Sequence, residues 1–74
     1  MSPDKLVYMA NQIGRFFASQ GEALAVASIA SHLQKFWDPR MRHANLAHAQ
    51  AGGVGLEPLV VQAIERLKDG GSSH

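Results

Sequence analysis

The chain has 74 residues, and seven lysines and arginines against six aspartates and glutamates leave a net charge of +1 with neutral histidines. A chain of this length forms at most one domain with a thin core, and the lack of cysteine excludes disulfides, thiolate zinc sites, cysteine-ligated iron–sulfur clusters and a cysteine nucleophile. The nearly balanced charge argues against non-specific binding to nucleic acid.

The first predicted helix covers residues 3–19 and opens with two residues typical of a helix start. Ser2 can accept a hydrogen bond from an N–H of the first turn, and Pro3 suits the first helical position because it has no N–H to leave unpaired. A rotation of about 100° per residue gives the helix one apolar stripe. Its members are Leu6, Met9, Ala10, Ile13, Phe16 and Phe17. Asn11 lies outside the stripe and Tyr8 nearly opposite it, so we expect Tyr8 to be exposed.

The second predicted helix covers residues 22–37 and has a wider apolar arc of nearly 180°. Its members are Ala23, Val26, Ala27, Ile29, Ala30, Leu33, Phe36 and Trp37. An arc this wide indicates burial against two other elements, so we predict that this helix is central to the fold.

Asp38 and Pro39 repeat the helix-start pattern and open a third predicted helix over residues 39–50. Proline keeps the preceding residue out of the α region, and aspartate is a good N-cap, so we expect a sharp corner between the second and third helices. Met41 and Leu46 lie on different sides of the third helix, among alanines and histidines. Because this helix has no apolar stripe, we predict that it is either loosely ordered in the isolated chain or covered by another chain.

The glycine-rich segment Gly52–Gly55 predicts a flexible linker before a fourth helix over residues 56–69. That helix has an apolar arc of about 140°. The arc consists of Leu56, Leu59, Val60, Ala63, Ile64 and Leu67. Gly70 is expected to end the helix, and residues 70–74 to form a flexible tail. Since no segment has a strand pattern, the sequence predicts an all-α fold, a single domain of residues 1–69 built as a small bundle of three to four short helices.

No residue pattern predicts a catalytic, cofactor-binding or metal site in this chain. The glycine-rich segment lacks the lysine and the serine or threonine of a phosphate-binding loop. His43 and His48 lie about 140° apart on one helix and cannot readily share a metal ion. Ser28, Ser31 and His32 fit a solvated helix face better than a nucleophile beside a base. We therefore predict that the chain is not an enzyme.

The corner between the second and third helices concentrates side chains that dominate protein interfaces. Trp and Arg bury a large area with a polar or ionic end, and Met is also enriched there. Trp37 fits the chain's own core and a partner contact about equally, whereas Arg40 and Arg42 favour a contact. The predicted partner-binding residues are Phe36, Trp37, Arg40, Met41 and Arg42.

Three stretches of the chain are informative through their order and spacing. They are MANQIGRFF (Met9–Phe17), HLQKFWDPRMR (His32–Arg42) and GGVGLEPLVVQAIERL (Gly52–Leu67). The most specific part is KFWDPRM, with MANQI upstream and GGVGL downstream. Together the stretches resemble the delta subunit of soluble, NAD-dependent, molybdenum-containing formate dehydrogenases, with departures in residues 43–51 and in the tail.

The resemblance implies an accessory, non-catalytic subunit of a cytoplasmic complex that interconverts formate and carbon dioxide. Its implied partners are the large catalytic and electron-transfer subunits, which carry the molybdopterin guanine dinucleotide, iron–sulfur clusters, FMN and the NAD site, with no cofactor in this chain. The implied role is docking on the large molybdenum subunit, which stabilises the assembled, cofactor-loaded enzyme. A soluble, cytoplasmic protein agrees with a sequence that has neither a basic, apolar export signal at its start nor a run of about 20 apolar residues.

Two other functions remain open on the sequence. One is a transient assembly factor for the same enzyme, which helps cofactor insertion and then leaves. The other is a helix-turn-helix protein that contacts DNA through the third helix with Arg40, Arg42, His43, Asn45 and Gln50. The low net charge and the short break between the second and third helices argue against that alternative. Self-association of the isolated chain through an exposed corner also remains open.

Overall fold

Four helices build the fold. The computed structural model describes residues 2–72, with residues 3 and 68–72 described by their backbone alone. The helices are α1 (Pro3–Phe17), α2 (Glu22–Phe36), α3 (Pro39–Gln50) and α4 (Pro58–Ser72), and a 3-10 turn, η1 (Ala18–Gln20), joins α1 to α2. No strand occurs within residues 2–72, and the predicted all-α class and small bundle are confirmed.

The helix ends differ from the predicted ones by a few residues. The first helix gives way to η1 after Phe17, and α2 ends at Phe36 because the backbone is extended at Trp37, with φ −96° and ψ 135°. The fourth helix begins two residues later than predicted, and its backbone continues to Ser72, past the predicted end at residue 69. The last two residues of the predicted tail, 73 and 74, lie outside the described residues.

The predicted capping residues begin α1 and α3. The Ser2 hydroxyl accepts a hydrogen bond from the Lys5 N–H at 3.2 Å, and the Asp38 carboxylate accepts one from the Met41 N–H at 2.9 Å. Each cap satisfies one of the N–H groups that the first turn of a helix leaves without a carbonyl partner. Two of the helix starts are therefore determined by interactions within four residues of sequence.

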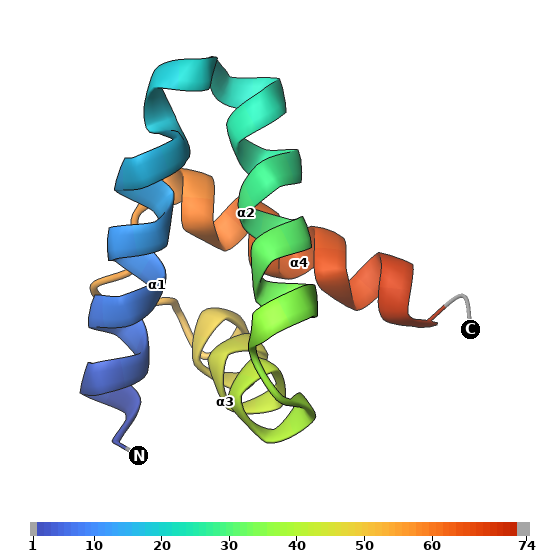
Figure 1. Ribbon diagram of the computed structural model, residues 1–74. Helices are drawn as coiled ribbons and strands as arrows, with labels where there is room; N and C mark the ends of the chain where they lie inside the picture. Colours follow the sequence, from blue (N-terminus) through green and yellow to red (C-terminus); the bar gives the residue numbers. More distant parts are fainter. Residues whose placement is uncertain (1, 73–74) are drawn as a thin grey trace.

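The helix α2 packs against two helices, α1 and α4, as its wide apolar arc predicts, but α1 and α4 also pack against α3, so α2 is not the single central helix that was expected. It runs antiparallel beside α1, with η1 connecting their upper ends, while α4 crosses behind it (Figure 1). The third helix lies across the lower end of this hairpin and packs against α1 and α4. Among residues 2–72, no helix is both long enough and apolar enough to cross a lipid bilayer.

The core is formed mainly by aliphatic side chains from α1, α2 and α4. Its buried members are Leu6, Ala10, Val26, Ile29, Ala30, Leu33, Trp37, Val60, Ala63 and Ile64. Three residues that the apolar arcs placed inside are exposed instead: Phe16, Ala23 and Phe36. Phe16 lies at the edge of the predicted arc of α1, and Phe36 in the last turn of α2. Since an arc gives a direction and not the extent of the neighbouring helix, it overestimates burial at edges and ends.

Gly14 marks the point where α1 approaches α4 closely. This glycine is buried, and a Cβ atom added to it would lie 2.6 Å from Cγ2 of Val60 on α4. Real Cβ atoms essentially never approach another heavy atom so closely, so the lack of a side chain allows α1 to approach α4. The apolar arc missed Gly14 because a glycine contributes no hydrophobic side chain to count.

The segment predicted as a flexible linker has a defined hydrogen-bonded structure. After α3, the Gly52 N–H donates to the Ala49 carbonyl at 3.3 Å and the Gly53 N–H to the His48 carbonyl at 3.0 Å, which is the Schellman pattern. Gly52 adopts φ +119° there, a backbone angle that suits glycine. The His48 ring also bonds to the Val54 carbonyl at 2.8 Å. The glycines thus serve the geometry of a cap and turn.

Asn11 of α1 holds the other end of this loop. Its Nδ2 donates to the Gly55 carbonyl at 2.8 Å and its Oδ1 accepts from the Glu57 N–H at 3.0 Å. Beside it, Arg15 forms an ion pair with Glu57 at 2.8 Å, but this exposed pair contributes at most about 1 kcal/mol. We expect the Asn11 amide to be the main polar link between α1 and the start of α4.

Replacing Asn11 with alanine is therefore expected to lower the free energy of unfolding by about 1–2 kcal/mol, because two hydrogen bonds are lost and the Glu57 N–H is only partly exposed. Urea denaturation followed by circular dichroism measures this change. The matched control is Gln12→Ala, whose side chain is exposed and bonds only to the Tyr8 hydroxyl, with an expected change within about 0.5 kcal/mol. Equal stabilities of the two variants would contradict the role given to Asn11.

Candidate partner-binding surface

The corner directs its two adjacent aromatic side chains to opposite environments. Phe36 is the last residue of α2 and is 72% exposed, whereas Trp37 is only 6% exposed and belongs to the core. The Trp37 N–H still donates to the Leu33 carbonyl at 3.0 Å, so Trp37 continues the buried face of α2, whereas Phe36 lies at the edge of that face. Asp38 then caps α3, which fixes the corner.

The five predicted contact residues are therefore not equivalent. Phe36 and Arg40 are exposed, Met41 and Arg42 are partly buried, and Trp37 is buried. The sequence did not decide whether Trp37 belongs to the chain's own core or contacts a partner. In the structure it belongs to the core. Met41 packs against the same core. Trp37 is thus part of the core, whereas Phe36 and Arg40, and parts of Met41 and Arg42, are open to solvent.

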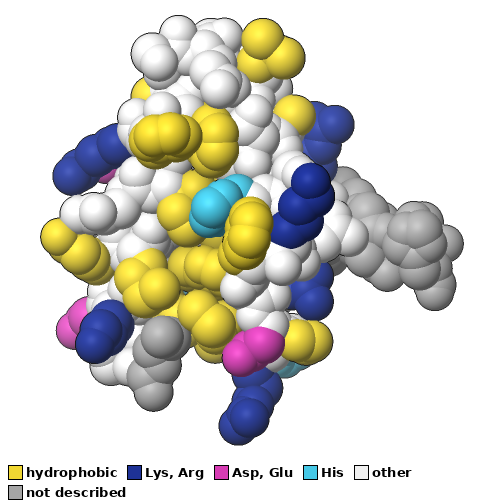
Figure 2. Space-filling model, in the orientation of Figure 1, with side chains coloured by type: hydrophobic (Ala, Val, Ile, Leu, Met, Phe, Trp, Pro, Cys, Tyr) yellow, Lys and Arg dark blue, Asp and Glu magenta, His cyan; other side chains and the backbone are white. Residues whose placement is uncertain are grey.

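Four aromatic rings, of which Phe16 and Phe36 are exposed and the other two partly buried, adjoin one another across α1 and α2. Ring centroids are 5.0 Å apart for Phe16 and Phe17, 6.1 Å for Phe17 and His32, and 4.7 Å for His32 and Phe36. We call these four residues the aromatic face. Figure 2 shows hydrophobic side chains gathered where α1 and α2 meet, with a histidine among them. Phe16 is 78% exposed, and large exposed apolar side chains grouped in this way are typical of binding surfaces.

A cleft lies between α2, α3 and α4. This cleft has a volume of about 710 Å³, within the range of roughly 300–1,000 Å³ usual for binding pockets. We call it the three-helix cleft. It is lined by Ala30, Leu33 and Gln34 of α2, by Arg42, Asn45 and Leu46 of α3, and by Ile64, Arg66 and Leu67 of α4, among others.

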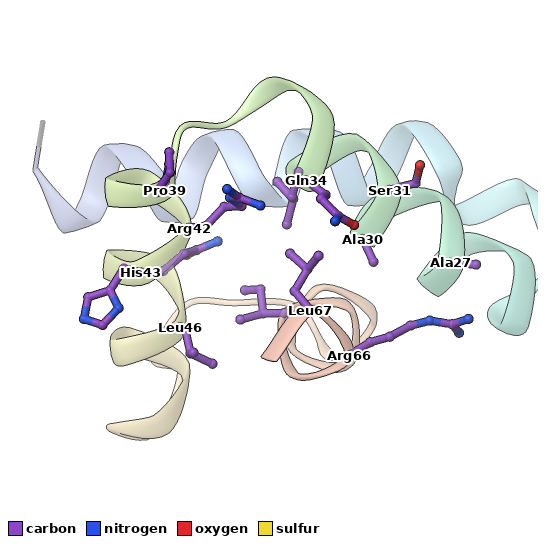
Figure 3. Close-up of a pocket in the computed structure, with 13 residues that line it drawn as sticks. Ala27, Ala30, Ser31, Gln34, Pro39, Arg42, His43, Leu46, Arg66 and Leu67 are labelled. Carbon is purple, nitrogen blue, oxygen red and sulfur yellow. The ribbon is translucent and has the colours of Figure 1, made fainter. Parts of the chain in front are cut away.

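The cleft has a cationic group at each end. Arg42 projects from α3 toward Gln34 of α2, and Arg66 extends from α4 beneath Ala27 (Figure 3). His43, although it lines the rim, turns its ring away (Figure 3). Among the described residues that line the cleft there is no aspartate or glutamate. The electrostatic character of the cleft therefore favours a negatively charged group.

Asn45 is the polar residue at the centre of the buried face of α3. It is 2% exposed, and within the part of the chain that the structure describes neither atom of its side-chain amide has a hydrogen-bond partner. The Arg42 Nε is also buried without a partner among the side chains and backbone groups that the structure describes. Buried polar groups are paired in most proteins, so these two side chains stand out.

The sequence reasoning missed Asn45 as a core-facing residue because it is polar. Counted with its neighbours, it completes a face about 140° wide. The members are Met41, Asn45, Leu46 and Ala49. Met41 and Leu46, which seemed to lie on different sides, are thus the two edges of one buried face, and both pack against the core.

A family model extends over most of this bundle. The model of the NADH-dependent formate dehydrogenase delta subunit FdsD matches residues 5–64. The chain belongs to the FdsD family. The predicted resemblance is thereby confirmed, and the match runs through residues 43–51, where the sequence departs from the pattern. No match is found among curated proteins or among solved structures.

The residues of this FdsD chain do not fit a bound redox group of their own. It has no cysteine to ligate an iron–sulfur cluster. Among the side chains that the structure describes, no group of three His, Asp or Glu residues lies close enough to hold a metal ion. The glycine-rich loop follows a helix rather than a strand, so it does not match a dinucleotide-binding turn.

Proposed function

We propose that the chain is a non-catalytic delta subunit that docks on the large molybdenum subunit of a cytoplasmic, NAD-dependent formate dehydrogenase. The observation that carries the proposal is the family match over residues 5–64, since a delta subunit acts as one part of an assembly. In this proposal the larger subunits carry the molybdopterin guanine dinucleotide, iron–sulfur clusters and FMN, and interconvert formate and carbon dioxide with NAD.

The exposed part of the corner supports a docking role. Phe36 is the last residue of the aromatic face. Arg40 lies in the first turn of α3, and its side chain is exposed. Arginine is among the residue types enriched where binding energy concentrates, and an exposed aromatic ring offers a large apolar area to bury. We assign the contact to Phe36, Arg40 and Arg42, with Trp37 and Met41 holding them in place.

Stabilisation of the complex follows from preferential binding. A subunit that binds the assembled, cofactor-loaded form more tightly than the unloaded form shifts the equilibrium toward the loaded form by mass action. The chain needs no redox group for this effect. We propose that its contribution to formate oxidation is to keep the large subunits in the competent state.

Affinity purification of the tagged chain from its native cytosol tests the proposal. The wild type is expected to recover an enzyme that reduces NAD with formate. The double variant Phe36→Ala/Arg40→Ala is expected to recover at least about tenfold less, since each side chain is exposed and the fold does not need it. The matched control, Tyr8→Ala/Lys5→Ala, removes an exposed aromatic and an exposed cation from α1 and is expected to behave as wild type.

Each outcome of this experiment has a distinct meaning. Recovery of no formate-oxidising enzyme by the wild type would overturn the proposed function. Equal recovery by both double variants would retain the subunit and exclude Phe36 and Arg40 as its contacts. Recovery only of immature enzyme without molybdenum would favour the transient assembly factor over a permanent subunit.

A further inference from the structure

Two polar side chains in the three-helix cleft have atoms without a hydrogen-bond partner in the part of the chain that the structure describes. Both amide atoms of Asn45 and the Nε of Arg42 are buried without partners among the described residues. An unpaired buried polar group is unfavourable, so each one in a native structure needs an explanation, and a partner supplied by a bound molecule is one such explanation. The partners that these two side chains need define the chemistry of what the cleft binds.

The Asn45 amide requires both an acceptor and a donor. A side-chain amide donates through Nδ2 and accepts through Oδ1, so its natural complement is a peptide backbone, which offers a carbonyl and an N–H. Asn11 of the same chain makes this pairing, with the Gly55 carbonyl at 2.8 Å and the Glu57 N–H at 3.0 Å. An inorganic anion would satisfy only the donor half of Asn45. The amide therefore favours a peptide segment.

The cations of the cleft specify a side chain on that segment. Arg42 has an unpaired buried Nε, and Arg66 lines the same cleft. Guanidinium groups bind carboxylates through parallel, charge-assisted hydrogen bonds. Because no described lining residue is acidic, the carboxylate must come from the occupant. Leu46, Ile64 and Leu67 line the cleft as well, which suits apolar neighbours of that acidic residue.

We propose that the three-helix cleft binds an extended, acidic segment of the partner protein. A backbone group of the segment pairs with the Asn45 amide, an aspartate or glutamate binds Arg42, and flanking apolar side chains cover Leu46 and Leu67. Gln34 and Arg66 are long and exposed at the cleft, so they can rotate to admit the segment. The inference rests on the proposed function, because the partner is the formate dehydrogenase on which the chain docks.

The test is a titration of the fluorescently labelled full-length chain into formate dehydrogenase purified without it. Asn45→Leu is expected to raise the dissociation constant at least about tenfold, since the amide loses its peptide contacts. The unbound Asn45→Leu chain is expected to melt at the same temperature as wild type or higher, because an unpaired amide has been removed from the core. Arg42→Ala is expected to weaken binding to a similar extent. The control Lys5→Ala removes one positive charge, as Arg42→Ala does, but from an exposed position of α1. It is expected to change the affinity less than twofold.

A second measurement identifies the bound segment. Benzoylphenylalanine introduced at Gln34, an exposed lining residue, is expected to cross-link to a partner segment that contains aspartate or glutamate. A cross-linked segment without an acidic residue would overturn the proposed chemistry even if both variants bind weakly. Wild-type affinity of Asn45→Leu and Arg42→Ala would overturn the inference alone. A wild-type chain that does not bind the enzyme would overturn the proposed function and this inference with it.

Discussion

Replacing Trp37 with alanine is expected to lower the free energy of unfolding by about 3–5 kcal/mol. The indole is the largest side chain in the core and is 6% exposed, so its removal leaves a cavity that the surrounding helices fill only in part. A domain of this length has a total stability of roughly 4–11 kcal/mol. The substitution is therefore expected to remove a large share of the total stability.

The neighbouring residue provides the control for this prediction. Phe36→Ala removes an aromatic ring one position earlier, but that ring is 72% exposed, and the expected change is within about 0.5 kcal/mol. Both variants are measured by urea denaturation with circular dichroism, since Trp37 is the chain's only tryptophan and its fluorescence is lost in one of them. Similar losses for both variants would show that the corner does not separate the two rings as the structure has them.

Replacing Gly14 with valine is expected to lower the free energy of unfolding by about 2–3 kcal/mol. The added Cβ would lie 2.6 Å from Cγ2 of Val60 and 3.8 Å from Cδ1 of Ile29. Val60 and Ile29 are themselves fully buried, so neither can move aside without shifting a helix. Overpacking of this kind costs about 1–3 kcal/mol or more, and the better helix propensity of valine recovers only a few tenths of a kcal/mol.

A double-mutant cycle separates this clash from other effects of the substitution. Val60→Ala removes the atom that the new Cβ meets, so we expect the double variant Gly14→Val/Val60→Ala to be more stable than the sum of the single changes predicts, by about 1 kcal/mol or more. Gln12→Val places the same residue at an exposed position of α1, with an expected loss within about 0.5 kcal/mol. Strict additivity in the cycle would contradict the close approach of α1 and α4 at Gly14.

Much of the fold could be predicted because its signals are local. The caps of Ser2 and Asp38 join residues three positions apart, and proline at the following position fixes the backbone at the helix start. The apolar periodicity of α2 and α4 is likewise read within one segment. Such interactions do not depend on how the helices pack against one another. The sequence therefore predicts the four helices and their order correctly.

The candidate site was harder to predict because it depends on packing between helices. Trp37 and Phe36 belong to the same apolar arc in sequence, and α2 ends between them. Trp37 is nevertheless buried in the core, whereas Phe36 is exposed. Asn45 was counted as surface because it is polar, and only the packing of α3 against α1 and α4 shows that it is buried. The three-helix cleft could not be inferred from any one segment.

The sequence by itself determined the helical class, the corner at Asp38 and Pro39, and the family, whose pattern depends on the order and spacing of short motifs. The tertiary structure decided which members of each apolar arc are buried, how Gly14 and Asn11 join α1 to its neighbours, and that Asn45 and Arg42 meet in one cleft. The physical reason is that capping and periodicity act over a few residues, whereas burial depends on the position and length of helices that are distant in sequence.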